Sequence, residues 1–214
     1  MNACSSKVTE IQIKGPPSMS SASRLPEATK SALGSLFPVF EKAGETLQLR
    51  VSAFDRDGAY LGSTPVEWQS SDLGVATVDA AGLVTVHSSG SFVISATTRE
   101  IDPKLSASLP LRSVIVGAVR IGQKHDDKDT EPEALKLALG ETVSMRADVL
   151  NDRDEVIADA KVRWRSAGYA VSITPDGEAE GRAIGDAQLV AEAKGKMARV
   201  DVHVVDWPKT RRTR

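Results

Sequence analysis

The chain has 214 residues, of which 41% are hydrophobic and 26% are charged, and its formal net charge at pH 7 is −2. These values are typical of a folded globular chain and exclude an intrinsically disordered one. The near-neutral charge argues against nucleic acid or anionic lipid as a partner recruited by the whole chain. The length allows two domains of about 100 residues each.

The N-terminal segment, residues 1–6, contains the single cysteine of the chain, Cys4. One cysteine forms no intramolecular disulfide, so the fold depends on packing alone. The order Ala3-Cys4-Ser5 resembles the junction at which bacterial lipoproteins are cleaved and lipidated, which makes Cys4 a candidate lipidation site and residues 1–6 a candidate anchor. No apolar stretch precedes Cys4, so this hypothesis requires a signal sequence upstream of Met1. The alternative is a free cysteine on a frayed terminus.

Residues 7–116 form a first predicted domain built from short strands. Turn residues such as Asp57-Gly58 and Ala81-Gly82 separate stretches in which apolar and polar residues alternate. Many short strands at this spacing predict an antiparallel β-sandwich. The predicted strands fall near residues 7–14, 45–54, 64–69, 75–79, 83–87, 91–98 and 107–116.

An insertion at about residues 15–41 follows the first predicted strand. It begins with a Pro- and Ser-rich stretch and ends with apolar residues that include Leu33, Leu36 and Phe37. A segment of this length on a compact sandwich is either a functional loop or a disordered one. The apolar residues are a candidate partner-docking loop, and the alternative is that they cover an open end of the core.

Residues 117–206 form a second predicted domain because the sequence of the first recurs there. Gly44-Glu45-Thr46 returns 96 residues later as Gly140-Glu141-Thr142, and Val66-Glu-Trp-Gln-Ser70 returns as Val162-Arg-Trp-Arg-Ser166. Further on the offset becomes 95, with the missing residue in a turn, where deletions are tolerated. A period of this length indicates a chain of domains rather than a solenoid. The predicted strands fall near residues 117–122, 141–150, 160–165, 170–174, 178–183, 187–193 and 197–205.

The second domain carries an acidic insertion at the place where the first domain carries its own. The carboxylates of Asp126, Asp127, Asp129 and Glu131 are candidate Ca²⁺ ligands. Their order does not match the twelve-residue calcium loop, so the alternative is a solvated charged loop without a metal. No other cofactor is expected.

The C-terminal tail, residues 207–214, is basic. Trp207 precedes the cations Lys209, Arg211, Arg212 and Arg214. These five residues are a candidate contact with an anionic envelope polymer or an acidic partner. The alternative is a frayed, solvated tail.

The motifs of the first domain resemble the bacterial immunoglobulin-like group 2 family. They are Gly44-Glu-Thr-Leu-Gln-Leu, Val66-Glu-Trp-Gln-Ser-Ser-Asp72, Val75-Ala-Thr-Val-Asp79 and Gly90-Ser-Phe-Val-Ile-Ser-Ala96. The second domain keeps Gly-Glu-Thr and the tryptophan and is similar to a divergent member. The resemblance implies an all-β fold of two tandem immunoglobulin-like antiparallel β-sandwiches. The matched position of Trp68 and Trp164 in a predicted central strand makes them core residues, filling space that a disulfide fills in some immunoglobulin domains. The alternative is that they are platforms on which a sugar ligand stacks.

No catalytic motif is present, so no enzymatic activity is expected. The three histidines accompany no nucleophile motif, and the sequence has no phosphate-binding glycine loop. The resemblance implies a cell-envelope or surface protein, lipid-anchored or secreted, that binds a protein or glycan partner, mediates adhesion or acts as a spacer. One alternative is an accessory module of a phage particle or an extracellular enzyme. Another is a carbohydrate-binding module, which would need several exposed aromatic side chains, and the sequence contains few aromatic residues.

Overall fold

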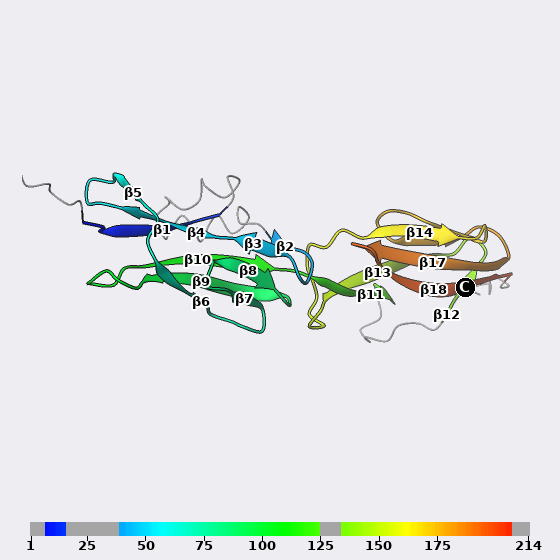
Figure 1. Cartoon of the computed structure of the whole chain (residues 1–214). Helices are drawn as coiled ribbons and strands as arrows, with labels where there is room; N and C mark the ends of the chain where they lie inside the picture. The colour runs from blue at the N-terminus through cyan, green and yellow to red at the C-terminus, as the bar shows by residue number, and fades with distance from the viewer. Residues whose placement is uncertain (1–6, 16–38, 125–133, 207–214) are drawn as a thin grey trace, which may run out of the picture. The chain divides into compact units, whose positions relative to one another are not determined.

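The computed structural model describes residues 7–15, 39–124 and 134–206. It divides the chain into two compact units, with the division between Ile115 and Val116. Both units are all-β, and both consist of mainly antiparallel sheets packed face to face as immunoglobulin-like β-sandwiches (Figure 1). The fold class expected from the sequence is confirmed.

The first unit contains strands β1 to β10. One of its sheets has the strand order β2-β10-β9-β6, and the opposite side is made of two short sheets, β1-β4-β5 and β3-β8-β7. Their bounds are β1 (Glu10–Lys14), β2 (Val39–Phe40), β3 (Thr46–Gln48), β4 (Arg50–Phe54), β5 (Tyr60–Gly62), β6 (Val66–Ser70), β7 (Ala76–Val78), β8 (Leu83–Val86), β9 (Gly90–Thr98) and β10 (Ser106–Ser113).

The second unit contains strands β11 to β18 in two four-stranded sheets. Their orders are β11-β13-β16-β15 and β12-β18-β17-β14. Their bounds are β11 (Val116–Gln123), β12 (Ala134–Ala138), β13 (Thr142–Asn151), β14 (Arg163–Ala167), β15 (Val171–Ile173), β16 (Glu178–Gly181), β17 (Gly185–Ala193) and β18 (Lys196–Val205).

The single strand expected over residues 45–54 is two strands, β3 and β4, separated at Leu49. The Leu49 amide donates to the Gly82 carbonyl at 2.8 Å, while β3 pairs with β8 and β4 pairs with β1. The equivalent strand β13 is continuous, although the Met145 amide makes the matching bond to the Gly177 carbonyl at 2.8 Å. The chain therefore passes from one pairing partner to the next at the same point in both units.

Two short strands, β2 and β12, are absent from the sequence-based prediction. Each is an edge strand of one sheet of its unit. β2 pairs with β10 and β12 pairs with β18, both in parallel. In each unit the first strand pairs with a neighbour in the opposite sheet, so the chain changes sheets between β1 and β2 and again between β11 and β12. The segments at 16–38 and 125–133, which connect these strands, lie outside the described residues.

Each unit has its own buried core. Ile94 and Val84 are completely buried in the first unit, and Leu189 and Val202 are completely buried in the second. These residues occupy the inward positions of alternating strands, where every second side chain faces the opposite sheet. The two clusters share no residue, so the hydrophobic core of each unit is formed by its own strands.

Candidate binding face

Trp68 and Trp164 lie at matched positions on β6 and β14 and face inward. Each is partly buried and packs against the core of its own unit, and each is paired with an alanine, Ala96 or Ala191, on the neighbouring strand. An inward indole contributes packing to the sandwich. The two rings are not presented as a row of stacking platforms for a sugar.

The glutamate of the repeated Gly-Glu-Thr motif holds a turn. Glu45 Oε2 accepts the Glu41 amide at 3.0 Å, and Glu141 Oε2 accepts the Ala138 amide at 2.7 Å. The glycine before it has a positive φ in both units, +83° at Gly44 and +77° at Gly140. The motif is therefore accounted for by turn geometry.

The aspartates of the family-like motifs also cap backbone turns. Asp72 Oδ1 accepts the Gly74 amide at 2.9 Å, and Asp79 Oδ1 accepts the Ala81 and Leu83 amides at 2.9 and 2.8 Å. Carboxylates used in this way form Asx turns. Their positions give no reason to assign them acid–base chemistry.

The two described histidines make single side-chain contacts on sheet surfaces. His87 Nε2 lies 2.9 Å from Thr77 Oγ1, and His203 Nδ1 lies 2.5 Å from Asp186 Oδ1. Across residues 7–15, 39–124 and 134–206, no group of three or more His, Cys, Asp or Glu side chains is placed to hold a metal ion. In the same residues no helix is long and apolar enough to cross a membrane.

The remaining candidate residues of the sequence analysis lie outside the part of the chain that the structure describes. They are the lipidation candidate Cys4, the docking candidates Leu33, Leu36 and Phe37, the calcium candidates Asp126, Asp127, Asp129 and Glu131, and the tail residues Trp207, Lys209, Arg211, Arg212 and Arg214. Their roles stay predictions.

The outer face of the β12-β18-β17-β14 sheet presents a group of arginines. Arg163 and Arg165 alternate with the inward Trp164 on β14, and Arg199 lies on β18, with β17 between the two strands. All three side chains are exposed. We call Arg163, Arg165 and Arg199, with the enclosed residues Val190, Glu192 and Met197, the arginine face.

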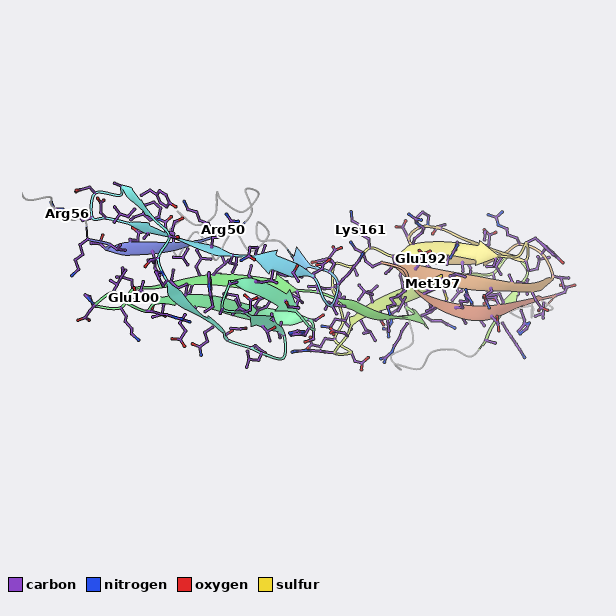
Figure 2. All side chains as sticks on the ribbon, viewed as in Figure 1. Arg50, Arg56, Glu100, Lys161, Glu192 and Met197 are labelled. Carbon is purple, nitrogen blue, oxygen red and sulfur yellow. The ribbon has the colours of Figure 1, made fainter. Side chains whose placement is uncertain are left out.

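The registry of the three strands arranges the arginine face in two rows. One row contains Arg163, Glu192 and Met197, and the next contains Arg165, Val190 and Arg199. Figure 2 shows Glu192 and Met197, together with Lys161, at the end of the sheet where β14 begins. In the direction away from this end, Asp201 and Asp186 follow on β18 and β17, so the cationic region is confined to these rows.

Val190 shows how Arg165 and Arg199 are held against the sheet. It is only 5% exposed, yet it lies outside the core cluster, because its side chain points to the outer face. Its direct neighbours on the two flanking strands are Arg165 and Arg199. The hydrocarbon stems of these arginines therefore cover Val190 while the guanidinium groups stay in solvent.

Arg165 is also fixed at its tip. Its guanidinium lies 3.3 Å from the Glu192 carboxylate, and Nη2 contacts Met197 Sδ at 3.3 Å. Arg163 and Arg199 make no ion pair with any described residue. The face thus holds three guanidinium groups against one neutralising carboxylate.

The matched face of the first unit has different chemistry. Its two rows are Glu67, Thr97 and Ser106, and Gln69, Ser95 and Ser108. Hydroxyl pairs connect its strands, with Ser95 and Ser108 oxygens 3.2 Å apart and Thr97 and Ser106 oxygens 3.1 Å apart. We call these six residues the hydroxyl face, which contains no cation.

Sequence reasoning did not single out the arginine face, although part of its signal was visible. Glu67-Trp68-Gln69 becomes Arg163-Trp164-Arg165 in the repeat, which changes the charge at two outward positions. Arg199 joins them only through the pairing of β17 with β18. That register is a tertiary feature and does not follow from the local pattern.

Comparisons with known proteins agree with the fold. The family model of the intimin immunoglobulin-like domain matches residues 58–100, a segment that includes β5 to β9. The match supports a bacterial immunoglobulin-like domain in the first unit. A search of curated proteins finds no match to the chain.

Several solved structures resemble the chain at low sequence identity. The S-layer protein rSbsC(31-844) is 14% identical with a TM-score of 0.37, over 94% of this chain and 28% of that protein. The chain therefore spans less than a third of the length of that S-layer protein. Human protocadherin-24 EC1-2 is 12% identical with a TM-score of 0.42, over 94% of this chain and 100% of that one. Mouse cadherin-23 EC22-24 is 16% identical with a TM-score of 0.38, over 79% and 61% of the two chains.

Proposed function

We propose that this chain is a non-enzymatic module of the bacterial cell envelope or surface, which uses immunoglobulin-like sandwiches for binding, adhesion or spacing. The observation that carries the proposal is the intimin immunoglobulin-like match over residues 58–100, on a unit whose motif carboxylates cap turns. Packed sheets whose turn amides are hydrogen-bonded form a rigid scaffold, and binding sites are then expected on exposed faces and loops.

The proposal includes two tandem copies of one domain type, both of the group 2 kind. The glycines at matched positions support this, since Gly82 and Gly177 have φ of +82° and +89°, and Gly90 and Gly185 have +150° and +141°. Matching side-chain turns add to it, because Asp55 Oδ1 accepts the Asp57 amide at 3.0 Å and Asn151 Oδ1 accepts the Arg153 amide at 2.9 Å. Turn details of this kind are retained on duplication while surface residues change.

Attachment through a lipid on Cys4 is the proposed route to the envelope, with the segment containing Leu33, Leu36 and Phe37 and the tail of Trp207, Lys209, Arg211, Arg212 and Arg214 as further candidate contacts. The experiment is to express the full-length precursor in its native bacterium, separate cytoplasmic, membrane and secreted fractions, and measure the intact mass. We expect the protein in the membrane fraction with a mass increase from acyl chains, and a Cys4→Ser variant that loses both the mass increase and the membrane association.

The outcomes separate the parts of the proposal. An unmodified protein in the secreted fraction overturns lipidation and keeps the surface function. A protein found in purified phage particles overturns the envelope assignment in favour of a particle component. A protein confined to the cytoplasm, unmodified, overturns the proposed function as a whole.

A further inference from the structure

We propose that the arginine face of the second unit binds a linear acidic polysaccharide through its carboxylate groups. The inference rests on the proposed function for the setting in which the polymer is met. The physical case rests on the three guanidinium groups, their spacing and their support. It is independent of the basic C-terminal tail.

The arrangement is built for repeated anionic groups. Neighbouring strands are about 4.8 Å apart and residues two apart on a strand are separated by about 7 Å, so the backbone positions of Arg165 and Arg199 lie roughly 10 Å apart and those of Arg163 and Arg165 about 7 Å apart. Guanidinium groups bind carboxylates in a two-pronged geometry that lysine cannot reproduce. Several such contacts at fixed spacing suit a polymer that carries one charge per repeat, since each bound group raises the effective concentration of the next.

Two of the three arginines are restricted before any ligand arrives. Arg165 and Arg199 lie along Val190, and Arg165 is held by Glu192 and Met197. Side chains already restricted in this way lose less conformational entropy on binding. Arg163 and Arg199 keep their charges free for an external partner within the described residues.

The composition of the face argues against a folded protein as the partner, and its lack of outward aromatic rings restricts a polysaccharide ligand to one that is held through its charges. Specific protein interfaces are centred on buried aromatic anchors with charges at the rim. The strands β14, β17 and β18 present no Phe, Tyr or Trp on their outer side, and their one aromatic residue, Trp164, faces the core. A small molecule would require a concave pocket rather than the outer face of a sheet.

The test measures binding of the purified full-length chain to immobilised alginate, a linear uronic-acid polymer, at about 0.15 M salt, where screening weakens nonspecific surface attraction. The variant Arg163→Gln/Arg165→Gln/Arg199→Gln removes the three cations. The control Arg50→Gln/Arg56→Gln/Arg112→Gln removes three exposed cations from the first unit and matches the change in net charge. Both retain the C-terminal tail, so the difference between them reports the arginine face.

We expect the arginine-face variant to bind alginate about 10- to 100-fold more weakly, because each exposed guanidinium–carboxylate contact contributes a factor of about 2 to 5. The control variant should stay within about 2-fold of the natural chain. Urea unfolding is measured for both variants, and an arginine-face variant that is fully folded under the assay conditions shows that lost binding is not lost folding. Equal weakening in the two variants overturns the proposal, because it assigns the attraction to net charge.

Three further probes test the class of ligand. Neutral dextran should not bind. Polyglutamate and double-stranded DNA should bind at least 10-fold more weakly than alginate. Binding to polyglutamate or DNA that equals or exceeds alginate binding overturns the polysaccharide assignment in favour of an acidic polypeptide or a nucleic acid. Failure here leaves the envelope function in place, since fractionation and intact mass decide that separately.

Discussion

Gly82 and Gly177 are the residues at which the repeated turn meets the tryptophan of each unit. A Cβ added at Gly82 would lie 2.7 Å from the Leu49 carbonyl oxygen and 3.0 Å from two Trp68 ring carbons. At Gly177 it would lie 2.5 Å from the Met145 carbonyl oxygen and 3.4 Å from Trp164 Nε1. Both glycines also have positive φ, so two independent constraints act at one position.

Replacing either glycine by alanine should therefore lower the free energy of unfolding of its unit by about 2 to 4 kcal/mol, as the sum of a left-handed backbone penalty and an overpacked contact. Urea unfolding of Gly82→Ala and Gly177→Ala measures the loss. Gly58→Ala is the matched control, because Gly58 has a φ of +79° and no atom within 4 Å of the added Cβ. It should cost only about 1 to 2 kcal/mol. Losses of the same size at Gly58 and Gly82 would show that the contacts with the Leu49 carbonyl and the Trp68 ring contribute nothing.

Glu141 supplies a second test at the scale of one side chain. Its carboxylate accepts the Ala138 amide at 2.7 Å, so Glu141→Ala should lower the unfolding free energy by about 0.5 to 1.5 kcal/mol. Glu141→Gln keeps an acceptor oxygen and should recover most of that loss. The comparison is made by chemical denaturation. A Gln variant as unstable as the Ala variant would mean that the negative charge, and not the hydrogen bond, stabilises the turn.

At the scale of elements, the strands that alternation predicts are those that carry both an inward and an outward set of residues over several positions. β9 and β17 are examples, with Phe92, Ile94 and Ala96 answering to Ala187, Leu189 and Ala191. β2 contains two residues and leaves no period to detect. β12 alternates over Leu135, Lys136 and Leu137, but its pairing partner is the last strand of the unit. Such a parallel contact with a distant segment is not specified by local sequence.

The same limit applies to the candidate site. The outward charges at 163 and 165 are readable in the repeat, while their grouping with Arg199 requires the β17–β18 register. The burial of Val190 likewise follows from its two arginine neighbours and not from its own position in the pattern. Sequence reasoning therefore yields the scaffold and part of the face, and the tertiary pairing yields the rest.

β12 offers the prediction that belongs to this scale. Leu137 is 2% exposed and belongs to the core of the second unit, whereas Lys136, next to it, is exposed. Leu137→Ala should cost about 2 to 5 kcal/mol of unfolding free energy, and Lys136→Ala should change it by less than about 0.5 kcal/mol. Thermal unfolding with calorimetry compares the two. A Leu137→Ala variant no less stable than Lys136→Ala would remove β12 from the core.

At the scale of the whole molecule, the division of the core into two separate clusters determines how the chain should unfold. No residue belongs to both clusters, and each unit has its own two opposed layers of strands. Protection of backbone amides follows the free energy of the cooperative unit to which they belong. We therefore expect two unfolding units within the full chain.

Hydrogen exchange with mass spectrometry on the natural chain and on Leu137→Ala tests this expectation. Amides of β13, β17 and β18 should exchange faster in the variant, by a factor of about 30 or more if the free energy of unfolding falls by about 2 kcal/mol. Those of β4, β9 and β10 should keep their rates. The reciprocal variant, Gly82→Ala, should reverse the pattern, accelerating exchange in the first unit alone. Acceleration in both units by either single substitution would show that the chain unfolds as one cooperative body despite its two cores.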